Sequence, residues 1–291
     1  MRYQNRSISG LLNIFCRWLA AALLLAATAG AWAQPAGGVR VLRDVAYGAD
    51  ARHKLDVYLP ARPTGPLILM VHGGAWALGD KASPDVVRQK VRHWVEGMGY
   101  VLVSANYRLL PAARPVDQAG DVARALAYVQ QQIPKWGADP KRVVLMGHSA
   151  GAHLAMLLHA SPAMVAQAGA QPWRVTVSLD SAAMDVEQLM RAPHARLYDR
   201  AFGADPAYWQ AASPYHQVST PGAPALLMIC SKLRQDDPCG QALHYEKKAS
   251  PFKHYMTIWG RDLSHADINR ELGAPGMYTD LVTNWLKDAL K

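Results

Sequence analysis

The chain has 291 residues, of which 51% are hydrophobic and 18% are charged. This balance excludes an intrinsically disordered chain, because high apolar content with a modest net charge allows a core to be buried. Three cysteines in a chain of this length exclude a small disulfide-stapled scaffold. The surplus of nine positive charges is spread along the chain without a basic run. Since no zinc-finger spacing or RNP-like aromatic motif accompanies it, nucleic-acid binding is not predicted.

Residues 1–33 have the features of a cleaved export signal. Arginines without any acidic residue come first, an apolar run occupies 18–30, and a small-x-small cleavage motif ends at Ala33. The apolar run is shorter than the roughly 20 residues that a membrane-spanning helix needs. We therefore expect a mature protein of residues 34–291, periplasmic or secreted and without a stable membrane anchor. An uncleaved anchor is the alternative.

From residue 39 onward, short aliphatic runs alternate with longer helical stretches. This alternation predicts an α/β domain with a mostly parallel eight-stranded sheet and helices on both faces. The first two strands, separated by a Gly-Ala-Asp turn, are expected to form an antiparallel hairpin. Strands are predicted over 39–46, 54–59, 67–71, 100–104, 142–146, 175–179, 225–230 and 254–259. Helices are predicted over 84–97, 117–131, 150–160 and 278–290.

One long segment interrupts the alternation. Residues 180–224, rich in Ala, Arg, Tyr and Trp, separate two predicted strands. An insertion at this point in an α/β sheet tends to lie above the carboxyl ends of the strands, where ligands bind. We expect a short helical cap there and not a separate domain.

The strongest local motif is Gly147-His148-Ser149-Ala150-Gly151, between a predicted strand and a predicted helix. This arrangement is typical of a nucleophile elbow, whose sharp turn needs glycines where side chains would collide. A capping serine in a glycine turn is the structural alternative, but it does not explain both glycines. Ser149 is therefore the candidate nucleophile.

A serine hydroxyl needs an oriented base to act as a nucleophile, and in this fold the acid and then the base follow the serine. His265, in a loop between the last strand and the last helix, is the candidate base. The acid is expected after the strand 225–230, where Asp236 and Asp237 compete. We favour Asp237, next to Pro238 at a predicted helix start, and keep Asp236 as the alternative.

Cys230 and Cys239 are the two cysteines outside the leader, and they flank the loop that carries both aspartates. In an exported protein, a disulfide between them is expected over two free thiols. Such a bridge would help to fix the acid.

The third element is His72-Gly73-Gly74-Ala75-Trp76, directly after the strand 67–71. A glycine-rich turn lets backbone N–H groups approach a developing oxyanion. The expected donors are the amides of Gly74, Ala75 and Ala150. Trp76, His148 and Tyr198 are candidate pocket residues, although cap aromatics that merely pack the cap onto the sheet are an equal alternative for Trp76 and Tyr198.

These motifs, together with Asn106-Tyr107-Arg108-Leu109 and the late aspartate and histidine, resemble the HGG-motif carboxylesterases of the α/β-hydrolase superfamily. That group includes hormone-sensitive-lipase-like esterases, acetyl or feruloyl esterases and arylformamidases. The resemblance implies the α/β-hydrolase fold, a Ser149, Asp237 and His265 triad, the oxyanion loop, and no metal or organic cofactor. Ala75 departs from the pattern, since many members have glycine there.

We therefore expect an exported serine hydrolase that cleaves small or short-chain carboxylic esters through an acyl-enzyme. An amide or formamide hydrolase is the nearest alternative, because the same triad serves any acyl transfer. A non-catalytic binding protein on the same fold is a second alternative. No His-Glu-x-x-His, zinc-spaced cysteine pair, GxGxxG or Walker loop occurs, so neither a metal nor a nucleotide cofactor is predicted.

Overall fold

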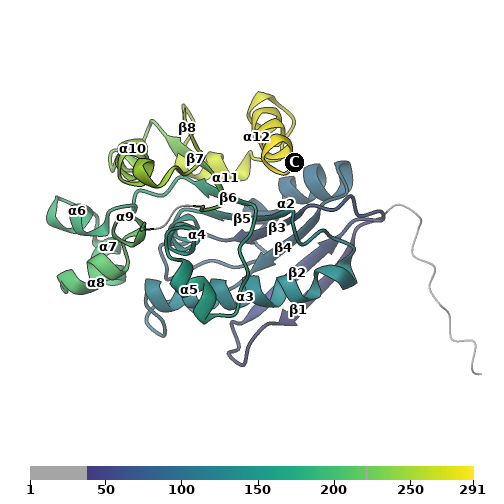
Figure 1. Ribbon diagram of the computed structural model, residues 1–291, viewed down its shortest axis with the longest axis horizontal. Coiled ribbons are helices and arrows are strands. Elements are labelled where there is room, and N and C mark those ends of the chain that lie inside the picture. The colour runs from purple at the N-terminus through teal and green to yellow at the C-terminus, as the bar shows by residue number, and fades with distance from the viewer. Residues whose placement is uncertain (1–37, 220–221) are drawn as a thin grey trace, which may run out of the picture. The chain divides into compact units, whose positions relative to one another are not determined.

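The strands of the described chain form one sheet in the order β1-β2-β4-β3-β5-β6-β7-β8 (Figure 1). This is a computed structural model that describes residues 38–219 and 222–291, so the predicted export signal lies outside the described residues. The strands are β1 (Arg40–Ala46), β2 (Lys54–Leu59), β3 (Leu67–Val71), β4 (Val101–Ala105), β5 (Val143–His148), β6 (Val175–Leu179), β7 (Ala225–Ser231) and β8 (Met256–Arg261). Strand β2 is antiparallel to both of its neighbours, and the pairs from β4 to β8 are parallel. The predicted opening hairpin and mostly parallel eight-stranded sheet are confirmed.

The helices follow the predicted order, with some differences at their ends. They are α2 (Pro84–Lys90), α3 (Pro115–Trp136), α4 (Ala150–Ala160), α5 (Pro162–Gln167), α6 (Val186–Arg191), α7 (Arg196–Phe202), α8 (Pro206–Ala211), α9 (Pro214–Gln217), α10 (Pro238–Ala249), α11 (His265–Arg270) and α12 (Met277–Ala289). A π-helical segment, η1 (Val91–Gly97), continues α2, and a 3₁₀ turn, η2 (Ser250–Phe252), follows α10.

Helix α3 is longer than predicted at both ends. Pro115 occupies its first turn, where the missing N–H has no helical partner to lose. The helix also continues past residue 131 and contains Pro134 before Gly137 ends it in a left-handed conformation. Its buried face, which includes Leu126, Val129 and Ile133, extends nearly to its carboxyl end, so packing on the sheet offsets the local cost of the proline.

Alternating strand residues divide the core into two layers. In β3, Leu67, Leu69 and Val71 pack with α3 and α4, whereas Ile68 and Met70 pack with α2, α11 and α12 on the other face. Figure 1 shows α2 and α12 on one side of the sheet and α3 on the other. All five β3 side chains are fully buried, as expected of a central strand covered on both faces.

The predicted cap consists of four short helices, α6 to α9, between β6 and β7. Phe202 and Ala201 of α7 belong to the same core cluster as the α3 and α4 side chains. The cap is therefore packed onto the body of the domain. No helix in the described part of the chain combines the length and the apolar character needed to cross a membrane.

Candidate active site

Ser149 lies in a sharp turn between β5 and α4, at the carboxyl edge of the sheet. Its backbone has a φ of 55°, in the left-handed region that a non-glycine residue rarely adopts. A Cβ on Gly147 would lie 2.2 Å from the carbonyl oxygen of Gly151, and a Cβ on Gly151 would lie 2.3 Å from the carbonyl oxygen of Val71. A side chain would therefore collide with the backbone at either position. This is the steric requirement for which the motif predicts a nucleophile elbow.

The Ser149 hydroxyl meets the imidazole of His265. Ser149 Oγ lies 2.9 Å from His265 Nε2, although the two residues are 116 positions apart in the chain. His265 is the first residue of α11, and Ser264 caps that helix by accepting a hydrogen bond from the amide of Asp267. The structure thus brings together the two residues that the sequence selected as nucleophile and base.

The carboxylate that contacts His265 is Asp180, not Asp237 or Asp236. His265 Nδ1 lies 2.6 Å from Oδ2 of Asp180, the residue that directly follows β6. Asp237 instead caps α10, where its carboxylate accepts a hydrogen bond from the Gly240 amide at 2.8 Å. Asp236 accepts hydrogen bonds from Tyr198 Oη at 2.9 Å and from the side chain of Arg234. The expectation that Asp237 contacts the base therefore differs from the structure.

Adjacent parallel strands explain this difference. Strands β6 and β7 end at the same edge of the sheet, so a carboxylate after either strand can reach the same space. Asp180 follows β6 at once, whereas Asp236 and Asp237 come several residues after β7, in an exposed loop. The sequence signal for this carboxylate is a single aspartate directly after the predicted strand 175–179, at the start of the expected cap.

Asp180 is fully buried, yet its neighbours favour the charged carboxylate. Burial favours the neutral acid, but hydrogen bonds from His265 and from the Ser231 amide, together with the charge of Arg234, hold the pKa of Asp180 below its ordinary value. Asp180 Oδ1 accepts the Ser231 amide at 2.7 Å. The carboxylate is thereby kept charged and fixed in orientation against His265.

His148 supports the loop that carries His265. Its Nε2 lies 2.9 Å from the His265 carbonyl oxygen, and the two rings are 4.6 Å apart. Burial, with the charge on His265, lowers the pKa of His148 to about 3. The ring is therefore neutral near pH 7, and because a carbonyl can only accept, Nε2–H is the donor. This contact is an additional role for a residue that was selected as a pocket residue.

The turn after β3 presents backbone amides beside Ser149. Gly74, Ala75 and Trp76 all have positive φ, and a Cβ on Gly74 would lie 2.2 Å from the Leu78 carbonyl oxygen. The Gly74 carbonyl accepts from the amides of Ala77 and Leu78, which closes the turn. Within the described residues, no hydrogen bond occupies the amides of Gly74, Ala75 or Ala150. These are the three donors predicted from the sequence.

A cavity of about 610 Å³ surrounds Ser149 and His265. Its wall is formed by the turn after β3, α2, α11, the cap and the loop after β7. The cavity volume is in the range of small-molecule sites. Trp76, His148 and Tyr198 line it as expected. Trp76 also has a packing role, since only 3% of its surface is exposed and its ring meets Phe202 edge-on. Trp76 thus lines the cavity and also packs in the core.

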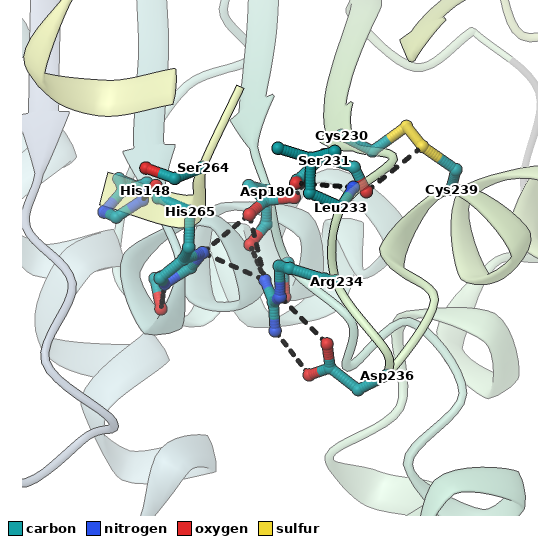
Figure 2. Close-up of polar contacts among 12 residues, drawn as sticks. His148, Asp180, Cys230, Ser231, Leu233, Arg234, Asp236, Cys239, Ser264 and His265 are labelled. Atoms are coloured by element: carbon teal, nitrogen blue, oxygen red, sulfur yellow. Dashed lines mark hydrogen bonds and ion pairs between the residues drawn. A yellow bond between two sulfur atoms is a disulfide. The ribbon is translucent and has the colours of Figure 1, made fainter. Parts of the chain in front are cut away.

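Cys230 and Cys239 form a disulfide that joins the end of β7 to the first turn of α10. Figure 2 shows it beside Ser231, on the loop that also carries Arg234 and Asp236. Across residues 38–219 and 222–291, no group of three or more His, Cys, Asp or Glu side chains is placed to hold a metal ion.

The family model BD-FAE matches residues 55–235, which is more than half of the chain. The chain belongs to the BD-FAE family. The matched residues include the turn after β3, the elbow at Ser149, Asp180 and Arg234, and the match ends before His265. The family match therefore covers most of the residues around the cavity, and His265 lies outside it.

Curated relatives of this BD-FAE chain bear esterase names. It is 33% identical over 140 residues to a probable isoprenylcysteine alpha-carbonyl methylesterase of Oryza sativa, which covers 47% of the chain and 32% of that protein. It is 30% identical over 205 residues to Esterase LipQ of Mycobacterium tuberculosis, which covers 64% of the chain and 47% of that protein. The chain thus spans less than half of the length of these relatives.

Solved structures show the fold over nearly the whole length. Esterase B from Lactobacillus rhamnosis, at 22% identity, has a TM-score of 0.70 and is matched over 96% of this chain and 94% of its own. Thermogutta terrifontis esterase 2, phosphonylated by sarin, has a TM-score of 0.67 at 18% identity, with coverage of 88% and 97%. The BD-FAE chain has the α/β-hydrolase fold, as predicted.

Proposed function

We propose that this protein is a serine esterase that hydrolyses small carboxylic esters through an acyl-enzyme, with Ser149, His265 and Asp180 as the triad. The observation that carries the proposal is the continuous chain of contacts from Ser149 Oγ to His265 Nε2 and from His265 Nδ1 to Asp180 Oδ2. This is the arrangement that activates a serine hydroxyl, irrespective of which strand supplies the acid. Membership in BD-FAE and the names of the relatives support an ester as the substrate.

The geometry supports the following sequence of steps. Asp180 holds the proton of His265 on Nδ1, which leaves Nε2 free to take the Ser149 proton as Oγ attacks the ester carbonyl. The imidazolium returns that proton to the alcohol oxygen as the C–O bond breaks and the acyl-enzyme forms. Water then attacks the acyl carbonyl and gives a proton to Nε2, and the imidazolium returns that proton to Ser149 Oγ as the acyl C–O bond breaks and the carboxylic acid is released.

The oxyanion of each tetrahedral intermediate is placed at the amides of Gly74, Ala75 and Ala150. These amides border the same cavity as Ser149, and each such donor typically contributes about 3 kcal/mol to lowering the barrier. Ala75 has a positive φ, as Gly74 does, which supports an intact turn without a third glycine. The departure from the common motif therefore leaves the donors in place.

The test is initial-rate hydrolysis of p-nitrophenyl esters from C2 to C12, with Ser149→Ala as the control. We expect rates that peak at the short acyl chains and fall by at least about 10⁴-fold in the variant, because the nucleophile is lost. A Ser149→Ala protein as active as the wild type would refute the proposal. Activity on N-formyl substrates but on no ester would move the assignment to a formamide hydrolase.

Export through the segment 1–33 is a further part of the proposal. The disulfide between Cys230 and Cys239 supports it, because such bonds persist in oxidising compartments. Amino-terminal sequencing of the protein recovered from a periplasmic or culture fraction should begin at Gln34. An intact leader on membrane-bound protein would instead indicate an anchor.

A further inference from the structure

Arg234 stands where three charged or catalytic side chains meet. Its guanidinium lies among Asp180, Asp236 and His265, as Figure 2 shows. Nη1 lies 2.8 Å from the Asp180 carbonyl oxygen and 3.1 Å from Asp180 Oδ2, while Nε lies 2.9 Å from Asp236 Oδ1 and Nη2 contacts Asp236 Oδ2. The Arg234 side chain is 18% exposed and that of Asp180 is fully buried, so water screens this pair little, whereas the Asp236 side chain is 36% exposed.

The contact between Arg234 and His265 is not an ordinary hydrogen bond. Nη1 lies 3.0 Å from His265 Nδ1, but the 2.6 Å contact with Asp180 Oδ2 requires the proton on Nδ1. Both nitrogens are therefore donors, and both direct their protons to the Asp180 carboxylate. The consequence is a positive guanidinium held next to the ring that becomes an imidazolium during the reaction.

The loop after β7 is built to keep Arg234 in this place. Ser231 donates its amide to Asp180 and its hydroxyl to the Leu263 carbonyl at 2.7 Å, so the loop is joined both to the acid and to the segment that precedes His265. The Cys230 to Cys239 disulfide closes the loop at its base. Asp236, itself bonded to Tyr198 of the cap, holds the far side of the guanidinium.

We infer that Arg234 is a positioning residue for the triad: it fixes the Asp180 carboxylate, and its charge, moderated by Asp236, sets the pH above which His265 works as a base. The inference rests on the proposed function and deepens it. The loop after β7, where the sequence predicted the acid, thus supplies a counter-charge to an acid that comes from β6.

Charged and titratable side chains from several elements surround His265. Besides Ser149, three side chains contact it: Asp180 after β6, Arg234 after β7 and His148 at the end of β5. Asp80, Asp85 and Asp236 line the same cavity as His265, Asp267 lies on its own helix, and Lys90 and Tyr278 bind that helix at Asn269 and Ile268. Of these groups, Arg234 is the cation that touches the ring.

The sign of the effect follows from this geometry. Removal of the guanidinium removes a positive charge 3.0 Å from Nδ1, so the imidazolium becomes more favourable and the neutral base appears only at higher pH. Removal of the Asp236 charge leaves Arg234 uncompensated, so the imidazolium becomes less favourable and the base is available at lower pH. A contact that served stability alone would shift the pH dependence in neither direction.

The experiment measures the pH profile of kcat/KM for the mature wild-type enzyme and four variants, with p-nitrophenyl acetate as substrate. In Arg234→Gln we expect the acidic limb to move up by about one pH unit and kcat to fall by about tenfold or more. Arg234→Lys keeps the charge and should retain the wild-type limb while losing part of kcat. In Asp236→Asn the limb should move down by a few tenths of a unit, because Asp236 is partly exposed.

Asp237→Asn is the matched control, since it removes a neighbouring carboxylate that faces the Gly240 amide. The acidic limb of its kcat/KM profile should coincide with that of the wild type. Unmoved limbs in both Arg234→Gln and Asp236→Asn would overturn the inference, and the second variant decides the matter if the first does not fold. If the proposed function itself were wrong, the wild-type enzyme would show no Ser149-dependent hydrolysis. That outcome is distinct from unmoved pH profiles in active variants.

Discussion

At the scale of single residues, the site depends on a few strained or buried positions. Ser149 and Asp180 both have positive φ, at 55° and 58°, and each directly follows a parallel strand. The surrounding hydrogen bonds hold both turns: the Ser149 amide donates to the Leu179 carbonyl, and the Asp180 amide donates to the Ile229 carbonyl. Strain of this kind persists where the neighbouring structure fixes it, which is common at functional sites.

Asp180 and Asp237 provide a direct test of the acid. We expect Asp180→Asn to reduce kcat by about 10⁴-fold, because an amide cannot hold His265 in the required tautomer. Asp237→Asn should leave kcat within about twofold and destabilise the fold by no more than about 1 kcal/mol, since asparagine also caps helices well. Esterase assays and thermal unfolding of the two variants measure both quantities. The opposite result, an inactive Asp237→Asn with an active Asp180→Asn, would return the acid to the loop after β7.

At the scale of elements, two short segments position the side chains that surround Ser149. One is the loop after β7, which binds Asp180 through Ser231 and Arg234. The other is α11, whose first residue is His265. Neither segment is long enough to be stable in isolation, so each depends on links to the rest of the domain.

The disulfide is such a link for the loop after β7. Replacement of Cys230 and Cys239 by alanine should lower the free energy of unfolding by about 2–3 kcal/mol, because the unfolded chain gains the entropy of an open loop. We also expect kcat to fall severalfold, as Ser231 and Arg234 lose their fixed positions on Asp180. Thermal unfolding and ester hydrolysis of the double variant, compared with the dithiothreitol-treated wild type, provide the measurement. Equal Tm and equal kcat in all forms would contradict this role.

At the scale of the whole molecule, distant parts of the chain are joined beneath the site. Lys90 of α2 donates to the carbonyl and side-chain oxygens of Asn269 in α11, at 2.7 and 2.9 Å and 179 positions away. Asn269 in turn donates to the Asp85 carbonyl at 2.8 Å. The helix that begins with His265 is therefore fastened to α2 by an amine that is 1% exposed.

Burial of Lys90 predicts a particular dependence of stability on pH. Burial lowers the pKa of Lys90 from 10.5 to about 7, with a smaller opposing effect of Asp85. Between these values the unfolded chain binds more protons than the folded chain, so this residue makes the free energy of unfolding rise with pH, by at most about 1.4 kcal/mol per unit. Below pH 7 the slope disappears and the penalty of burying the charge is fully present.

The variant Lys90→Met isolates this contribution. The difference in Tm between wild type and variant should move in favour of the wild type as the pH rises from 7 to 9.5, because other titrating groups are common to both proteins. Differential scanning calorimetry at several pH values provides the measurement. A difference in Tm that is constant across this range would show that Lys90 does not titrate there.

Much of the fold and two of the three proposed triad residues, Ser149 and His265, follow from the sequence. Central strands such as 67–71 are continuous aliphatic runs, and a run of this kind is stable only when both faces are covered. The elbow is equally local, since its glycines are required by backbone contacts within and beside one turn. His265 was selected by its place between the last strand and the last helix, which is fixed by the order of elements along the chain.

Which carboxylate contacts His265 is decided by the tertiary structure alone. Asp180, Asp236 and Asp237 all follow strands that end at the same edge, and their order in the chain does not tell which carboxylate points toward the base. The path of the loop after β7 decides it: Asp237 turns to cap α10, Asp236 turns to Arg234 and Tyr198, and the space beside His265 is left to Asp180. Local chemistry determines turns and periodicity, whereas the pairing of distant charges depends on how neighbouring strands and loops are brought together.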